Sequence, residues 1–164
     1  MITSEKKLCV EKAPFIIEII DHSPFIDIII NYNEIKFKLL AKYSIELCYA
    51  DIQDIIGNNF YTGFQCKGIG TLLVNTAVQY FQLILPDTAD VTGKMSDVGD
   101  PREQAELEKC RMIRNNFWKS FGFEILPGTW GYQNFKSKLG KIKLKSSGSV
   151  IDSIPRLIPL SEFK

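Results

Sequence analysis

The first third of the chain alternates apolar and polar residues in short runs, which is the pattern of half-buried β-strands. Three runs rich in isoleucine and phenylalanine cover Phe15 to Ile20, Phe25 to Asn31 and Ile35 to Leu40. The strings Asp-His-Ser-Pro and Asn-Tyr-Asn separate them, and both have the composition of tight turns. This pattern predicts a meander of antiparallel strands.

A further extended segment is predicted from Tyr43 to Ile56. Side chains alternate between the two faces of a regular strand. Asp54 is therefore expected on one face together with Ile52, and Asp51 on the opposite face.

The middle of the chain changes to a helical period. From Ile69 the apolar residues recur every three to four positions, which predicts an amphipathic helix with one buried stripe that Pro86 ends. A short strand is expected from Ala89 to Met95. The residues of the stripe are Leu72, Leu73, Thr76, Ala77, Tyr80, Phe81 and Ile84.

A second helix is predicted from Pro101 to Phe121, with Asp100 as its N-cap and Gly122 as the left-handed residue that ends it. Its apolar positions are Leu107, Cys110, Ile113, Phe117 and Phe121.

Two more strands are expected near the end, at Phe123 to Leu126 and at Lys141 to Lys145. The second belongs to a run of lysines without any acid, namely Lys136, Lys138, Lys141, Lys143 and Lys145. The run fits a solvated edge strand, and the alternative is a surface that binds an acidic acceptor.

With 164 residues and 45% hydrophobic residues, the chain has the size and composition of one globular domain, 1–164. The serine-rich stretch at 146–149 indicates that residues 146–164 form a flexible joint and a C-terminal tail. No apolar run approaches the ~20 residues that span a bilayer. The first twelve residues hold five charges and do not resemble a secretory signal, so a cytoplasmic protein is expected.

The charge balance and the cysteines exclude several classes. Twenty basic against nineteen acidic residues give a net charge of +1, so no global field favours nucleic acid or a membrane surface. The four cysteines are far apart and the chain has one histidine, so no metal site is expected and the thiols should be free. His22 lies in a turn string that explains its presence, and catalysis is the alternative.

The string Gln65-Cys-Lys-Gly-Ile-Gly70 stands between an extended segment and a helix. Glycines at this point let a ligand approach the backbone, and the amides of the first helical turn favour an anion such as a pyrophosphate. The string matches neither a P-loop nor a dinucleotide fingerprint. A tight turn without a ligand is the alternative.

Gln65-x-x-Gly68-x-Gly70 resembles the coenzyme A loop of the GNAT superfamily of acyltransferases, written [Gln/Arg]-x-x-Gly-x-[Gly/Ala]. Further along, Phe117-Trp-Lys-Ser-Phe-Gly-Phe-Glu124 resembles the end of that family's last helix and the start of the next strand. The resemblance covers roughly residues 43 to 145. It implies an α/β (α+β) fold in which a mixed, mostly antiparallel sheet contains a central splayed pair of parallel strands and is flanked by helices.

The resemblance also implies a function, N-acetyl transfer from acetyl-CoA to an amine by direct attack in a ternary complex. The acceptor would be a small-molecule or peptide amine, no metal would take part, and a homodimer is possible. The pantetheine arm would pass between the strands Leu47 to Ile56 and Ala89 to Met95, and backbone amides near Gln53 to Ile55 would polarise the thioester. The pyrophosphate would be held by the amides of Gln65, Cys66, Lys67, Gly68, Ile69, Gly70 and Thr71. For Cys66, a reactive thiol is the alternative role.

The chain departs from the family pattern on the last helix. Trp118 replaces the tyrosine that protonates the leaving thiolate, so water or Ser96 would have to supply that proton. The indole of Trp118 either faces the thioester and closes the pantetheine channel or belongs to the core. The paired helices that wall the family's acceptor site have no room here, because strands crowd residues 15 to 56.

A base for the acceptor ammonium is expected among Asp54, Asp51 and Glu46, each of which could instead be a solvated carboxylate. Two other functions stay open. One is a catalytically silent coenzyme A-binding or interaction domain with the same fold, and the other is a strand-rich binding module in which the glycine loop is only a turn.

Overall fold

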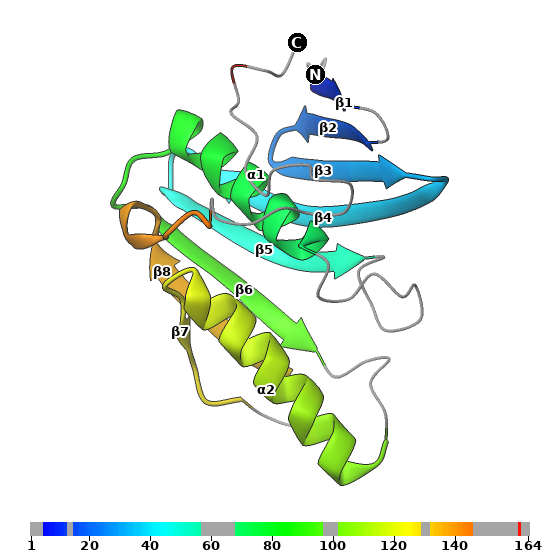
Figure 1. The fold of residues 1–164 in the computed structure, drawn as a ribbon. Coiled ribbons are helices and arrows are strands. Elements are labelled where there is room, and N and C mark those ends of the chain that lie inside the picture. The colour runs from blue at the N-terminus through cyan, green and yellow to red at the C-terminus, as the bar shows by residue number, and fades with distance from the viewer. Residues whose placement is uncertain are drawn as a thin grey trace.

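The computed structural model describes residues 5–12, 15–56, 68–96, 102–128, 132–145 and 161. The described residues form one mixed α+β unit with eight strands and two α-helices (Figure 1). The elements are β1 (Lys6–Lys12), β2 (Phe15–His22), β3 (Phe25–Tyr32), β4 (Ile35–Ser44), β5 (Tyr49–Ile56), α1 (Ile69–Ile84), β6 (Asp90–Ser96), α2 (Gln104–Ser120), β7 (Glu124–Ile125), β8 (Tyr132–Lys138) and a 3₁₀ turn, η2 (Leu139–Lys141).

All eight strands belong to one sheet in the order β1-β2-β3-β4-β5-β6-β8-β7. Strands β1 to β5 form an antiparallel meander. Its strands β2, β3 and β4 were predicted, whereas β1 was not. The pair β5–β6 is parallel, and the pairs β6–β8 and β7–β8 are antiparallel. The expectation of a mostly antiparallel sheet with a central parallel pair is therefore confirmed.

The predicted single strand from Tyr43 to Ile56 is wrong. Strand β4 runs on to Ser44, a turn occupies residues 45–48, and β5 begins at Tyr49. The ladder between β4 and β5 pairs Ala41 with Ile52 and Leu40 with Asp54, so Gln53 is an extra residue, a β-bulge. The bulge breaks the alternation of faces along β5.

We name the two faces of the sheet by their residues, because cross-strand partners project to the same side. The helix face carries Ala41, Ile52 and Gly93, and the reverse face carries Lys42, Asp51 and Thr92. Both described helices lie on the helix face, α1 against β3 and β4 and α2 against β7 (Figure 1).

Helix α1 begins at Ile69 and ends at Ile84, as predicted. The prediction of a single buried stripe is wrong, because every residue from 69 to 78 is buried. One further contact explains part of this burial. The amide of Asn75 donates to the carbonyl of Lys145 at 3.0 Å and accepts from the Lys145 N–H at 3.1 Å, so the chain after η2 also packs on α1.

Helix α2 begins at Gln104 with Glu103 as its N-cap, later than predicted, and Asp100 and Pro101 lie outside the described residues. It ends at Ser120, and Gly122 has the expected left-handed backbone with φ of 90°. The expected apolar positions are half-buried except for buried Phe121, whereas Trp118 is the most buried residue of α2.

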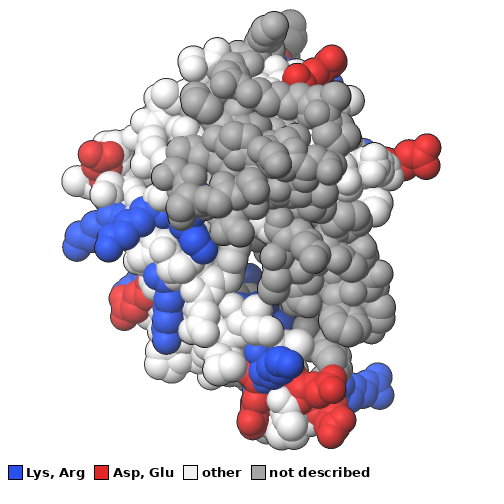
Figure 2. All heavy atoms as spheres, in the orientation of Figure 1, with Lys and Arg blue, Asp and Glu red and all other residues white. Residues whose placement is uncertain are grey.

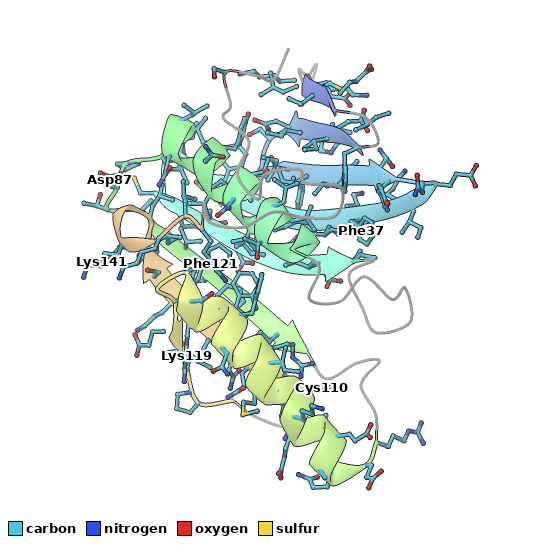
Figure 3. The ribbon with its side chains drawn as sticks, viewed as in Figure 1. Phe37, Asp87, Cys110, Lys119, Phe121 and Lys141 are labelled. Atoms are coloured by element: carbon cyan, nitrogen blue, oxygen red, sulfur yellow. The ribbon has the colours of Figure 1, made fainter. Side chains whose placement is uncertain are left out.

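The predicted edge strand at Lys141 to Lys145 is wrong. Lys141 is the last residue of η2, and the segment pairs with none of the described strands. The Lys143 N–H donates to the Phe121 carbonyl at 2.8 Å, at the end of α2. The alternation of lysine with Ile142 and Leu144 in this segment arises because these two apolar side chains pack against the core, while Lys141 and Lys143 are exposed. Figure 3 labels Lys141 in η2 and Lys119 near the end of α2, and Figure 2 shows several positive side chains on this side of the molecule.

The strand that follows β7 was not predicted. Strand β8 has the polar sequence Tyr-Gln-Asn-Phe-Lys-Ser-Lys and lies between β6 and β7, with only Phe135 buried. Lys136 and Lys138 belong to this internal strand and pair with Glu124 and Asp90 across the reverse face. The lysine run is therefore split between two surfaces.

A buried cluster of three polar side chains ties α1 to the sheet. The carboxylate of Asp21 on β2 accepts hydrogen bonds from the phenols of Tyr43 on β4, at 2.9 Å, and Tyr80 on α1, at 2.5 Å. Asp21 is 9% exposed and Tyr80 2%. Burial, reinforced by the hydrogen bond and charge of Asp21, raises the pKa of Tyr80 well above its ordinary value.

This cluster predicts a loss of stability at alkaline pH. Because the pKa of Tyr80 is raised in the folded state, its contribution is complete below pH ~10 and falls as pH rises above that value, by about 1.4 kcal/mol per pH unit. Denaturant unfolding between pH 8 and pH 11 measures the slope. The Tyr80→Phe variant should have a flatter slope, and equal slopes in both proteins would contradict the prediction.

Candidate functional site

The sheet opens between its two parallel strands. Strands β5 and β6 pair only as far as Ile52 and Gly93, although β5 continues to Ile56 and β6 to Ser96. Beyond that point β5 stays paired with β4, and β6 stays paired with β8. The two halves of the sheet therefore diverge (Figure 1), and the facing backbone edges of β5 and β6 no longer pair with each other.

The described part of the glycine loop lies where α1 begins. Gly68 has φ of 89°, the left-handed conformation that favours glycine, and is the N-cap of α1. Gly68 makes no side-chain cap hydrogen bond, and the first turn itself carries no acidic residue, so the positive end of the helix dipole fits an anion.

Gly68, Ile69, Gly70 and Thr71 are all buried. Gln65, Cys66 and Lys67 lie outside the described residues. The roles predicted for these seven residues therefore stay predictions.

The predicted carboxylates Asp51 and Asp54 share the reverse face, which corrects the expectation of opposite faces. Asp51 pairs with Lys42 across β4, and the bulge at Gln53 turns Asp54 to the same side by pairing it with Leu40. Asp51 accepts a hydrogen bond from Thr92 at 2.8 Å and lies 3.9 Å from the Lys42 ammonium. Asp54 is exposed beside the opening.

Glu46 and His22 lie away from the opening. Glu46 is in the turn before β5, at the paired end of the β5–β6 ladder. His22 is the last residue of β2, three strands from β5, beside the carboxylates of Glu5 and Asp27. Neither side chain is placed to serve a reaction between β5 and β6.

Trp118 belongs to the core. Its ring stacks on Phe135 at a centroid distance of 4.0 Å and makes edge contacts with Phe117 at 5.1 Å and Phe123 at 5.5 Å. Phe135 in turn lies against Gly93, where a Cβ would overlap the ring. With 6% exposure, the indole occupies the second of its two expected places, between α2 and the sheet.

Ser96 is the last residue of β6, and its backbone pairs with Tyr132 at the mouth of the opening. The placement of its side chain lies outside what the structure describes. Its predicted role as a proton source therefore stays a prediction.

Two residues at the opening were not singled out from the sequence. Lys94, on β6, places its ammonium 4.0 Å from the centre of the Tyr132 ring on β8. Lys94 lies in a strand that the sequence did predict, but its neighbour lies in β8, which the sequence did not indicate. No sequence signal would have joined the two.

Neither described helix is long and apolar enough to cross a bilayer. Within the described ranges, no three potential ligands among His, Cys, Asp and Glu gather into a metal-binding group. Comparisons with protein-family models, with curated proteins and with solved structures find no match to this chain.

Proposed function

We propose that the protein is a GNAT-like acyltransferase that moves an acetyl group from acetyl-CoA to an amine. The observation that carries the proposal is the parallel pair β5–β6, which stops pairing at Ile52 and Gly93 while both strands continue. Beyond this point the facing backbone groups of β5 and β6 do not pair with each other, and they would offer hydrogen bonds to an extended chain such as pantetheine.

The donor would bind on the helix face. Helix α1 is the next element after β5, and its N-terminal end, with Gly68 as N-cap and Gly70 in the first turn, lies toward the arrowhead of β5 (Figure 1). A pyrophosphate there would lie against amides without a Cβ at two positions. Acetyl-CoA supplies the acyl group as an activated thioester.

The acceptor would approach from the reverse face, where Asp54 is exposed at the edge of the opening. In the reaction the amine nitrogen forms a bond to the acyl carbon and the carbon–sulfur bond breaks. Asp54 takes the first proton from the acceptor ammonium, which frees the amine to attack. After the attack the nitrogen loses its second proton to solvent, and solvent returns a proton to the leaving thiolate. Backbone amides near Gln53 to Ile55 would stabilise the negative charge on the acyl oxygen.

The core position of Trp118 does not prevent this reaction. A general acid contributes a rate factor of ~10²–10⁴, whereas holding the two reactants in line gives effective molarities of ~10⁵–10⁸ M. The parent thiol has a pKa of ~8.5, so a thiolate leaves without strong assistance. Positioning is the larger of the two effects.

One observation favours a second candidate, a silent coenzyme A-binding domain. Trp118 packs on Phe135 and so presents no proton donor at the position where the family uses a tyrosine. This candidate shares the donor site and lacks turnover, so binding and turnover assays separate the two.

Coenzyme A at 100 times its dissociation constant is expected to raise the free energy of unfolding by ~2.7 kcal/mol. Thermal unfolding measures this, with 3′,5′-ADP and pantetheine as the two halves of the ligand. The loop hypothesis requires the nucleotide half to contribute, because the α1 amides would hold its phosphates. An unchanged melting temperature with saturating coenzyme A would contradict both hypotheses, the acyltransferase and the silent coenzyme A-binding domain.

A further inference from the structure

Lysines on the reverse face are mostly neutralised by carboxylates from neighbouring strands. Lys38 lies 2.7 Å from Asp27 and Lys138 lies 2.6 Å from Asp90. Opposite charges on neighbouring strands of a solvated sheet face stabilise the sheet by forming such cross-strand pairs. The other pairs are Lys7–Glu18, Lys42–Asp51 and Lys136–Glu124.

This pattern changes where the sheet opens. The last rung of the parallel ladder joins Ile52 to Gly93, so Asp54 and Lys94 are the next charged residues on the reverse face at each side of the gap. Both are exposed. Neither has an ion-pair partner within the part of the chain that the structure describes.

The divergence of the strands explains why these two charges do not neutralise each other. On adjacent paired strands, an aspartate and a lysine in these positions would be within reach of an ion pair. Here each strand stays with its outer neighbour. Lys94 turns to the ring of Tyr132 instead, a cation–π contact that leaves its ammonium free to bind an anion.

We propose that the acceptor is a small zwitterion, a primary amine that also carries a carboxylate. Its ammonium would bind at Asp54 and its carboxylate at Lys94, with the molecule bridging the opening on the reverse face. This inference rests on the acyltransferase function proposed above. Tyr132 acts as a positioning residue, because its ring holds the Lys94 ammonium at the opening.

Release of free thiol from acetyl-CoA, measured with two matched series of acceptors, tests the proposal. One series is unbranched ω-amino acids of increasing length, and the other is alkylamines of the same lengths without the carboxylate. For the best chain length, kcat/KM should be at least ~10-fold higher for the amino acid, since a hydrogen bond between charged groups contributes about a factor of 10 to 100.

The Lys94→Gln variant should remove this preference by raising the KM for the amino acid, so that the ratio of the two kcat/KM values falls toward 1. Lys36→Gln is the matched control, because Lys36 is an exposed lysine of the same face without an ion-pair partner among the described residues. It lies roughly 13 Å along β4 from the residue that pairs with Asp54. The control should keep the wild-type ratio.

Binding gives a second readout that does not depend on turnover. Calorimetric titration of the preferred amino acid into the coenzyme A complex should show affinity that Lys94→Gln weakens by about 10- to 100-fold. Equal kcat/KM values for both series, or a preference for diamines, would overturn the zwitterion inference and leave the acyltransferase standing. Absence of thiol release with every amine would overturn both proposals, and a coenzyme A-induced rise in melting temperature would then identify the silent domain.

Discussion

Replacing Trp118 with alanine is expected to lower the free energy of unfolding by about 3–5 kcal/mol, the usual cost of truncating a large buried aromatic residue. Trp118 stacks on Phe135, and Phe135 covers Gly93 on β6, so one side chain links α2 to the smaller half of the sheet. Its removal leaves a cavity that rigid strands cannot fill. Denaturant unfolding measures the loss.

Two further variants make this result specific. Met112→Ala, at a 58% exposed position of the same helix, should change stability by less than ~0.5 kcal/mol. Trp118→Tyr introduces the tyrosine that the proposed acyltransferase function would use as a proton donor, but it buries a hydroxyl among rings, at a cost of about 1–3 kcal/mol. Unchanged stability together with faster acyl transfer per folded molecule would instead place Trp118 at the reaction site.

The second large effect is expected at Asp21. Asp21→Ala removes the common acceptor of Tyr43 and Tyr80 and leaves the buried Tyr80 phenol unsatisfied, at a cost of about 1–3 kcal/mol. Tyr43 loses the same acceptor but keeps a side-chain hydrogen bond with Ser23, so it adds less to the loss. Because Tyr80 lies on α1, the docking of the helix that carries the proposed phosphate site should be the part that loosens.

A double-mutant cycle tests the assignment of this loss to the hydrogen bonds. In Asp21→Ala combined with Tyr80→Phe, the Tyr80 hydroxyl that would lack its acceptor is gone, so the double variant should be more stable than the sum of the single effects predicts. Additive losses would mean that Asp21 and Tyr80 do not interact energetically. Unfolding by denaturant at pH 7 supplies all four free energies.

Local patterns in the sequence determined the elements whose signal is local. The isoleucine-rich runs from Phe15 to Leu40 predicted three strands of the meander, and the apolar spacing from Ile69 predicted the bounds of α1. Gly122 predicted the left-handed end of α2. In each case hydrophobic period and turn chemistry act between residues that are close in the chain, so the sequence alone carries the information.

Tertiary structure decided what depends on partners far apart in the chain. The bulge at Gln53 exists only relative to β4, and it brings Asp54 to the face of Asp51 and beside the opening. Strand β8 is polar and is defined by pairing with β6, which is why Tyr132 meets Lys94. Trp118 and Asp21 are buried because residues from other elements surround them. The register of the strands, the divergence of β5 from β6 and the burial of individual side chains depend on contacts between residues far apart in the chain. A local pattern of residues does not contain that information.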